Sequence, residues 1–157
     1  KTSSRGIRSF NPMLTLDIRG DQRVIGKLDQ ALQRINNPKS LMTETGDLLI
    51  KEFQENFPQE GGNLNEAWEP LQPETIIQRL RLGYPARPIL VRSGKLMRGF
   101  QKEVKTFQVR VHNPVDYFKY HQAGGKNLPR RRMIHAPEWL KQEVVRVFAD
   151  FVRKIFV

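Results

Sequence analysis

The stretch VKTFQVRVH, residues 104–112, decides the fold of this chain because it is the clearest β-strand in the sequence. Its apolar residues alternate with polar ones, and this period of two gives a strand one apolar face. The Asn-Pro pair at 113–114 is a turn signal. Residues 115–120 then predict the return strand, so we expect a hairpin at about 104–121.

Helical patterns lie on both sides of this hairpin, and Pro137 suits the first turn of a long C-terminal helix. A short alternating segment at residues 14–18 predicts an N-terminal strand. The sequence therefore predicts an α+β fold, in which the hairpin and this strand form a small antiparallel sheet flanked by helices. The shorter helices are expected at residues 21–35, 40–57, 73–81 and 93–100.

The C-terminal helix carries an unusually wide apolar face over residues 140–156, which covers roughly half of its circumference. A helix that packs on one core needs a stripe of only about 100°. Two interpretations stay open. Either the helix is buried on two sides within its own domain, or part of this face meets another subunit.

Length and composition are those of a folded domain of ordinary size. We assign residues 13–157 to one domain. Residues 1–12 are polar and aperiodic, and they are interpreted as a disordered arm or as sequence upstream of a natural start at Met13. The chain has no cysteine, so disulfides and thiolate sites are not available to it. Neither a membrane span nor a signal peptide is visible.

Positive charge is concentrated in residues 79–132, which hold fourteen Lys and Arg residues but only two acids, Glu103 and Asp116. The rest of the chain is close to neutral. A single cationic surface is one interpretation, and phosphate is a usual partner for such a surface. The alternative is that these side chains pair with acids elsewhere in the fold or lie along its surface.

Few residues suggest chemistry. The three histidines, His112, His121 and His135, lie too far apart in sequence to form a recognisable ligand pair, and no metal or cofactor is expected. The glycine pair at 124–125 lacks the remaining residues of a phosphate-binding loop. Acids are too scarce in the basic block to support a two-carboxylate hydrolase. We therefore expect that the protein is not an enzyme.

A segment rich in proline and polar residues, WEPLQPETIIQRL at 68–80, carries the first of several ordered motifs. Trp68 is interpreted as a plug that fills an edge of the core. The other marked positions of this segment are Pro70, Leu71, Thr75 and Arg79.

Two further motifs follow along the chain. In ILVRSGKLMRGF at 89–100, Ser93 and Gly94 are interpreted as a helix cap that precedes Leu96. In the segment that begins with Tyr120, His121 and Gln122 are expected to hold the loop that follows the hairpin.

The order of these motifs resembles the phage virion morphogenesis family, the tail-completion proteins of contractile-tailed phages and related prophages. In that family a W-x-P-L…T…R segment precedes an L…(S/T)-G-x-L helix start, a strand hairpin, a Y-x-x-H-Q-x-G turn and a P-x-R tract. The resemblance covers roughly residue 13 to the C-terminus, and the triple arginine at 130–132 is more basic than the family pattern requires. The turn and the last tract are matched by Tyr117 or Tyr120, His121, Gln122, Gly124, Pro129 and Arg131.

This resemblance implies a structural, non-enzymatic role: a tail-completion or tail-terminator protein at the head–tail junction of the virion, assembled in the cytoplasm of the host bacterium. The implied partners are further copies of the chain in a ring such as a hexamer, together with tail-tube and head-neck proteins. Contact with packaged DNA is compatible with this role.

The residues that we expect on an interaction surface are cationic or lie beside cations. The arginines at 130–132 are expected to be exposed, so that glutamine in their place leaves the fold intact. Since arginine suits carboxylate as well as phosphate, protein and DNA remain equally open as partners. The competing function is a small, non-specific nucleic-acid-binding protein. The surface candidates are Arg130, Arg131, Arg132, Lys126, His121, Gln122 and Arg110.

Overall fold

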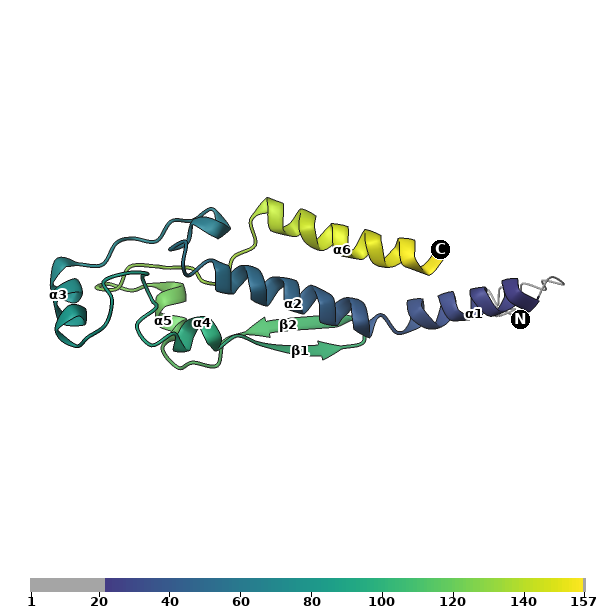
Figure 1. The fold of residues 1–157 in the computed structure, drawn as a ribbon, viewed down its shortest axis with the longest axis horizontal. Coiled ribbons are helices and arrows are strands. Elements are labelled where there is room, and N and C mark those ends of the chain that lie inside the picture. The colour runs from purple at the N-terminus through teal and green to yellow at the C-terminus, as the bar shows by residue number, and fades with distance from the viewer. Residues whose placement is uncertain (1–21, 157) are drawn as a thin grey trace, which may run out of the picture.

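The computed structural model describes residues 22–156, which form an elongated molecule of helices around one small sheet (Figure 1). The α+β class and the long C-terminal helix are confirmed. The expected arm at 1–12 and strand at 14–18 lie outside the described residues. The elements are α1 (Gln22–Asn36), α2 (Lys39–Glu55), η1 (Gly62–Leu64), α3 (Pro73–Arg81), α4 (Lys95–Arg98), β1 (Gln101–Lys105), β2 (Gln108–His112), α5 (Phe118–Ala123) and α6 (Glu138–Phe156).

Helix α2 is the central layer, between the hairpin on one side and α6 on the other (Figure 1). Gly46 lies where α2 meets the hairpin. A Cβ atom there would come within 2.8 Å of Cγ2 of Val109 and 2.9 Å of Cδ of Lys102. Glycine weakens a helix by about 1 kcal/mol relative to alanine, so the close approach of the hairpin explains why this helix carries one.

The hairpin is shorter than the sequence predicts and lies earlier in the chain. Strands β1 and β2 are antiparallel, with Val104 opposite Val109, and the chain turns at residues 106–107. Phe107 was expected on the apolar face of a strand, but it lies in this turn and is 71 % exposed. Residues 104–112 therefore contain the end of one strand, the turn and the second strand.

The prediction of a return strand at 115–120 is wrong, because these residues form a turn and the start of α5. Asn113 directs the chain away from the sheet. Its Oδ1 accepts a hydrogen bond from the backbone N–H of Val115 at 3.2 Å, and its Nδ2 donates to the carbonyl of Leu96 at 2.7 Å. Val115 is buried in the core as a result.

The core is one hydrophobic cluster in which several aromatic rings meet. Trp68 lies in it, as the plug interpretation expects, and meets Phe57 edge to face with ring centroids 5.3 Å apart. Its indole Nε1 donates a hydrogen bond to the carbonyl of Arg132 at 3.0 Å, so the long 58–72 loop is fastened to the segment before α6. The other buried members of the cluster are Phe53, Leu64, Ile89, Leu96, Phe100, Val115, Met133 and Leu140.

Helix α6 uses only part of its wide apolar face within the chain. Leu140 is fully buried, and the helix packs on α2 and α1. Val145 is 65 % exposed, and Phe148 and Val152 are exposed beside it. Leu32 on the neighbouring helix α1 is 55 % exposed. Both helices thus leave apolar side chains exposed, and α1 lies beside the C-terminal end of α6 (Figure 1).

Candidate functional site

Helix α3 lies at the end of the molecule opposite α1 (Figure 1). It borders two adjoining cavities. Their volumes are about 520 and 550 Å³. Leu71, Thr75, Leu90 and His121 line both cavities. We call the continuous depression the α3 groove.

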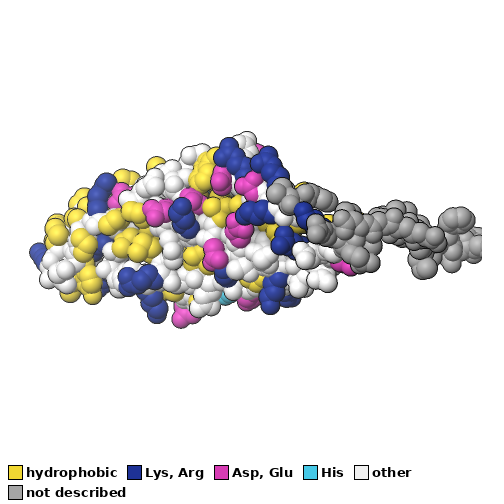
Figure 2. All heavy atoms as spheres, turned by 45° about the vertical axis from the view of Figure 1, so that its right-hand side comes forward, with side chains coloured by type: hydrophobic (Ala, Val, Ile, Leu, Met, Phe, Trp, Pro, Cys, Tyr) yellow, Lys and Arg dark blue, Asp and Glu magenta, His cyan; other side chains and the backbone are white. Residues whose placement is uncertain are grey.

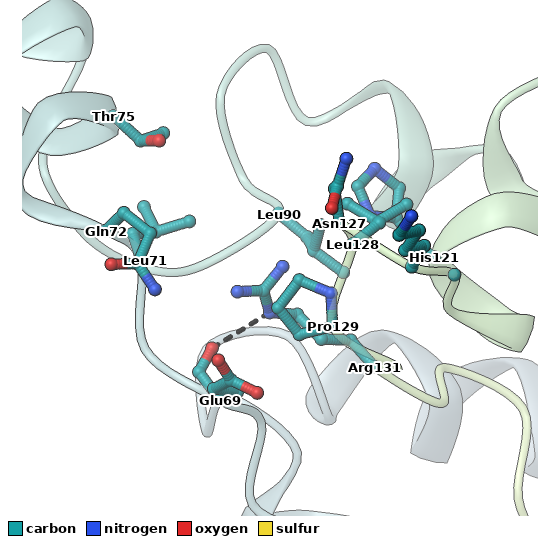
Figure 3. Close-up of a pocket in the computed structure, with 12 residues that line it drawn as sticks. Glu69, Leu71, Gln72, Thr75, Leu90, His121, Asn127, Leu128, Pro129 and Arg131 are labelled. Atoms are coloured by element: carbon teal, nitrogen blue, oxygen red, sulfur yellow. Dashed lines mark hydrogen bonds between the residues drawn. The ribbon is translucent and has the colours of Figure 1, made fainter.

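Arg131 lies in the first cavity and is buried, not exposed as the sequence predicts: only 4 % of its surface is accessible. Its Nε donates a hydrogen bond to the carbonyl of Glu69 at 2.9 Å, and its Nη2 donates to the carbonyl of Pro70 at 3.2 Å. Figure 3 shows the guanidinium reaching into the space between Leu71 and Leu90. Burial lowers the pKa of Arg131 from its ordinary value, since a charge loses solvation there.

Arg79 occupies a similar position in the second cavity and is 6 % exposed. Its Nη2 donates hydrogen bonds to the carbonyls of Pro88 and Val91, both at 3.3 Å. Its Nε is buried and has no hydrogen-bond partner among the described residues. Burial is the main cause that lowers the pKa of Arg79, and Arg92 adds repulsion. Arg79 thus joins α3 to the 88–91 loop while one of its donors remains free.

His121 lines both cavities, and Gln122 follows it at the end of α5. Gln122 fastens the following segment, because its Oε1 accepts hydrogen bonds from the N–H groups of Met133 and Ile134 at 2.8 and 3.0 Å. Of the two residues expected to hold this loop, Gln122 makes the contact. His121 presents a buried Nδ1 with no partner among residues 22–156. Burial, followed by the charge of Arg131, lowers its pKa.

The other two arginines of the triplet differ in exposure and in how closely they approach Glu66. Arg132 forms a salt bridge with Glu66, and its Nε donates a hydrogen bond to the same carboxylate. This hydrogen bond is the largest cause that lowers the pKa of Glu66. Arg130 is 3.9 Å from Glu66, and its side chain is mostly exposed. The expectation of three exposed cations is therefore wrong for Arg131, and half-buried Arg132 has a carboxylate partner.

The remaining candidates divide between the groove and the rest of the surface. Lys126 is exposed and lines the first cavity. Ser93 lines the second, and its Oγ accepts a long hydrogen bond of 3.4 Å from the N–H of Lys95. The capping position itself is taken by Gly94, with φ at +74°. Arg110 is exposed on β2 and does not line the groove.

The three motif segments of the sequence converge on the α3 groove. Thr75 and Arg79 come from the first segment, Ser93 from the second, and His121 and Arg131 from the third. Several lining residues were missed because no local pattern marks them. The nearest signal is the scarcity of acids in residues 79–132. The missed residues include Glu69, Tyr84, Leu90, Arg92, Lys95 and Asn127.

The described residues offer the groove no catalytic equipment that we recognise. No group of three or more His, Asp or Glu side chains in residues 22–156 is arranged to hold a metal ion. Within the same part of the chain, no helix is long and apolar enough to cross a membrane. The groove offers two buried guanidinium groups beside the apolar side chains of Leu71 and Leu90.

The model of the phage virion morphogenesis family matches residues 20–146, which include all three motif segments. This chain belongs to that family, and its role is a structural one in the assembly of the phage particle. Comparisons with curated proteins and with solved structures found no match.

Proposed function

We propose that the protein completes the phage tail at its head-proximal end, where it acts through protein–protein interfaces and associates with further copies of itself in a ring such as a hexamer. It is placed in the virion after assembly in the host cytoplasm. The tail tube and the head-neck proteins are its neighbours in this proposal, and packaged DNA lies within reach.

One observation supports this proposal above the others: α1 and α6, which contact each other, each leave apolar side chains exposed. Exposed apolar side chains are normal when scattered singly, but a contiguous set is typical of an interface. On each helix the exposed apolar residues are three or four positions apart and so share one side of it: Leu28, Leu32 and Ile35 on α1, and Val145, Phe148 and Val152 on α6. The two helices contact each other, and Nη1 of Arg34 donates a hydrogen bond to the carbonyl of Lys154 at 2.9 Å.

The nucleic-acid alternative draws on the basic block, but part of that charge has partners inside the molecule. Arg79 and Arg131 are buried, and Lys102 pairs with Asp47 at 2.5 Å. Arg87 pairs with Glu60 at 3.1 Å. On the face that Figure 2 shows, positive and negative side chains are interspersed, so this face is not a single cationic surface.

A reconstruction of the particle tests the proposed location. We expect density for this chain at the head-proximal end of the tail, with neighbouring copies in contact through α1 and α6. Particles in which that end carries no such density would contradict the proposal. In solution, the nucleic-acid alternative requires tight binding to duplex DNA of any sequence, with affinity that falls steeply as salt rises.

A further inference from the structure

Two cations are buried in the α3 groove without a carboxylate partner among the described residues. Arg79 and Arg131 are each more than nine-tenths buried, and their side chains donate only to backbone carbonyls. Removing a charge from water is costly unless it is paired and fully hydrogen-bonded. Carbonyl dipoles offset part of that cost, but Nε of Arg79 is a buried donor with no acceptor among the described residues.

The lining of the groove strengthens the positive field around these two groups. Lys126 borders the first cavity, and Arg92 and Lys95 border the second. Glu69 is the one carboxylate residue in the described lining of either cavity. Glu60 lies near Arg79, but its carboxylate already binds Arg87 and accepts a hydrogen bond from the N–H of Ile89 at 2.9 Å.

The groove carries apolar side chains among its polar ones, and these favour a peptide over a nucleic acid as the occupant. Leu71 and Leu90 face each other across the space that the Arg131 guanidinium enters (Figure 3). Leu96 adds apolar surface in the second cavity. A DNA backbone needs exposed cations that follow its phosphates. A peptide can instead insert a side-chain carboxylate between apolar contacts.

We propose that the α3 groove binds an extended acidic segment of a partner protein, whose carboxylates pair with Arg131 in the first cavity and Arg79 in the second. Apolar side chains between the acidic ones contact Leu71 and Leu90. Carboxylate suits these positions because Nη1 of each guanidinium donates no hydrogen bond to the described residues, and charge-assisted bonds to a carboxylate are strong. The inference rests on the proposed function, since a structural protein of the particle acts through such contacts, and it adds the chemistry of the partner.

Binding in solution tests the groove directly. The probe is a short labelled peptide of alternating leucine and aspartate, and its counterpart contains asparagine in place of aspartate. We expect the full-length protein to bind the first peptide at least about tenfold more tightly, a difference of about 1.4 kcal/mol. Equal binding of the two peptides, or no binding of the acidic one, would overturn the proposal.

Variants at exposed positions locate the binding without threatening the fold. Thr75→Trp fills the groove from α3 and should weaken binding of the acidic peptide at least about tenfold. Ile77→Trp places the same side chain on α3 outside the groove lining, changes no charge, and should leave binding unchanged. If Thr75→Trp binds as the parent does, the peptide does not occupy the groove and the proposal fails.

A matched pair of charge variants separates the groove from general electrostatics. Lys126→Gln with Lys95→Gln removes two charges at the groove, whereas Lys105→Gln with Lys119→Gln removes two exposed charges elsewhere. Only the first pair should weaken peptide binding. Equal losses, or a random duplex DNA that competes for the groove in the same salt, would overturn the acidic-peptide proposal. Because the assay uses no particles, its failure leaves the proposed tail location to be judged separately by reconstruction.

Discussion

At the scale of single residues, Trp68 joins two distant parts of the chain. Replacing it with alanine removes its contact with Phe57 and the hydrogen bond to the carbonyl of Arg132. We expect Trp68→Ala to lower the free energy of unfolding by about 3–5 kcal/mol, as for other large-to-small changes in a core. Denaturant melts measure this loss. A change below about 1 kcal/mol would be incompatible with a core position.

Trp68→Phe provides a milder comparison at the same position. It keeps an aromatic ring against Phe57 but loses the indole donor, so the carbonyl of Arg132 loses one partner. We expect a smaller loss than for alanine, of at least about 1 kcal/mol.

The three adjacent arginines should respond differently to the same substitution. Arg130→Gln changes a mostly exposed side chain and should alter the free energy of unfolding by less than about 0.5 kcal/mol. Arg131→Gln leaves the carbonyls of Glu69 and Pro70 without their buried donors, and we expect a loss of about 2–3 kcal/mol. The same melts compare the two variants. Equal effects at the two positions would contradict the buried role of Arg131.

This contrast also shows what sequence reasoning misses at the residue scale. Three adjacent cations look alike in a sequence, and repulsion between them suggests exposure. Tertiary contacts make them different, because the carbonyls of residues 69 and 70 approach only the middle one and Glu66 approaches the last. The motif pattern did mark Arg131 and Arg79, although it did not reveal that both line one groove.

At the scale of elements, Gly46 is a site where helix propensity and packing oppose each other. Gly46→Ala improves propensity by about 1 kcal/mol, but the new methyl group overlaps Val109 and Lys102. Overpacking costs about 1–3 kcal/mol, so we expect a net loss of up to about 2 kcal/mol in denaturant melts. Gly26→Ala is the matched control, since nothing lies within 4 Å of its added methyl, and it should not destabilise the protein.

The positions of the periodic helices could be predicted from sequence, whereas the position of the sheet in the chain could not. Helices α2, α3 and α6 form where apolar spacing and proline positions indicate them. The hairpin was misplaced because its turn at 106–107 (Thr-Phe) carries no Gly, Asn or Pro signal, while the Asn-Pro pair at 113–114 does. That pair does change the direction of the chain, but it leads into α5 because Asn113 bonds to Leu96 and Val115.

At the scale of the whole molecule, the wide apolar face of α6 has two parts. One part packs inside the chain, and the other is exposed. Val145→Asp combined with Phe148→Asp introduces two charges into the exposed part. We expect this variant to stay folded but to lose self-association across a concentration series in analytical ultracentrifugation. The physical reason is that burying an unpaired carboxylate in an apolar interface is strongly unfavourable.

Arg146→Asp is the control for that experiment. It changes the net charge of the chain by the same amount, and it lies in the row of exposed charged pairs on α6, where Arg146 bonds to Glu143 at 2.8 Å. Its self-association should match that of the parent. Loss of association in the control as well would indicate a charge effect and not an apolar interface.

The described molecule is elongated, with α1 and the C-terminal end of α6 towards one end and helix α3 at the other (Figure 1). If the long axis of this molecule runs along the tail axis, a compact label attached after α6 lies at a different height on the tail from a label attached to α3. Two labelled particles, compared at modest resolution, would reveal which end of the chain faces the head. The length of the fold thus makes its polarity in the virion a measurable quantity.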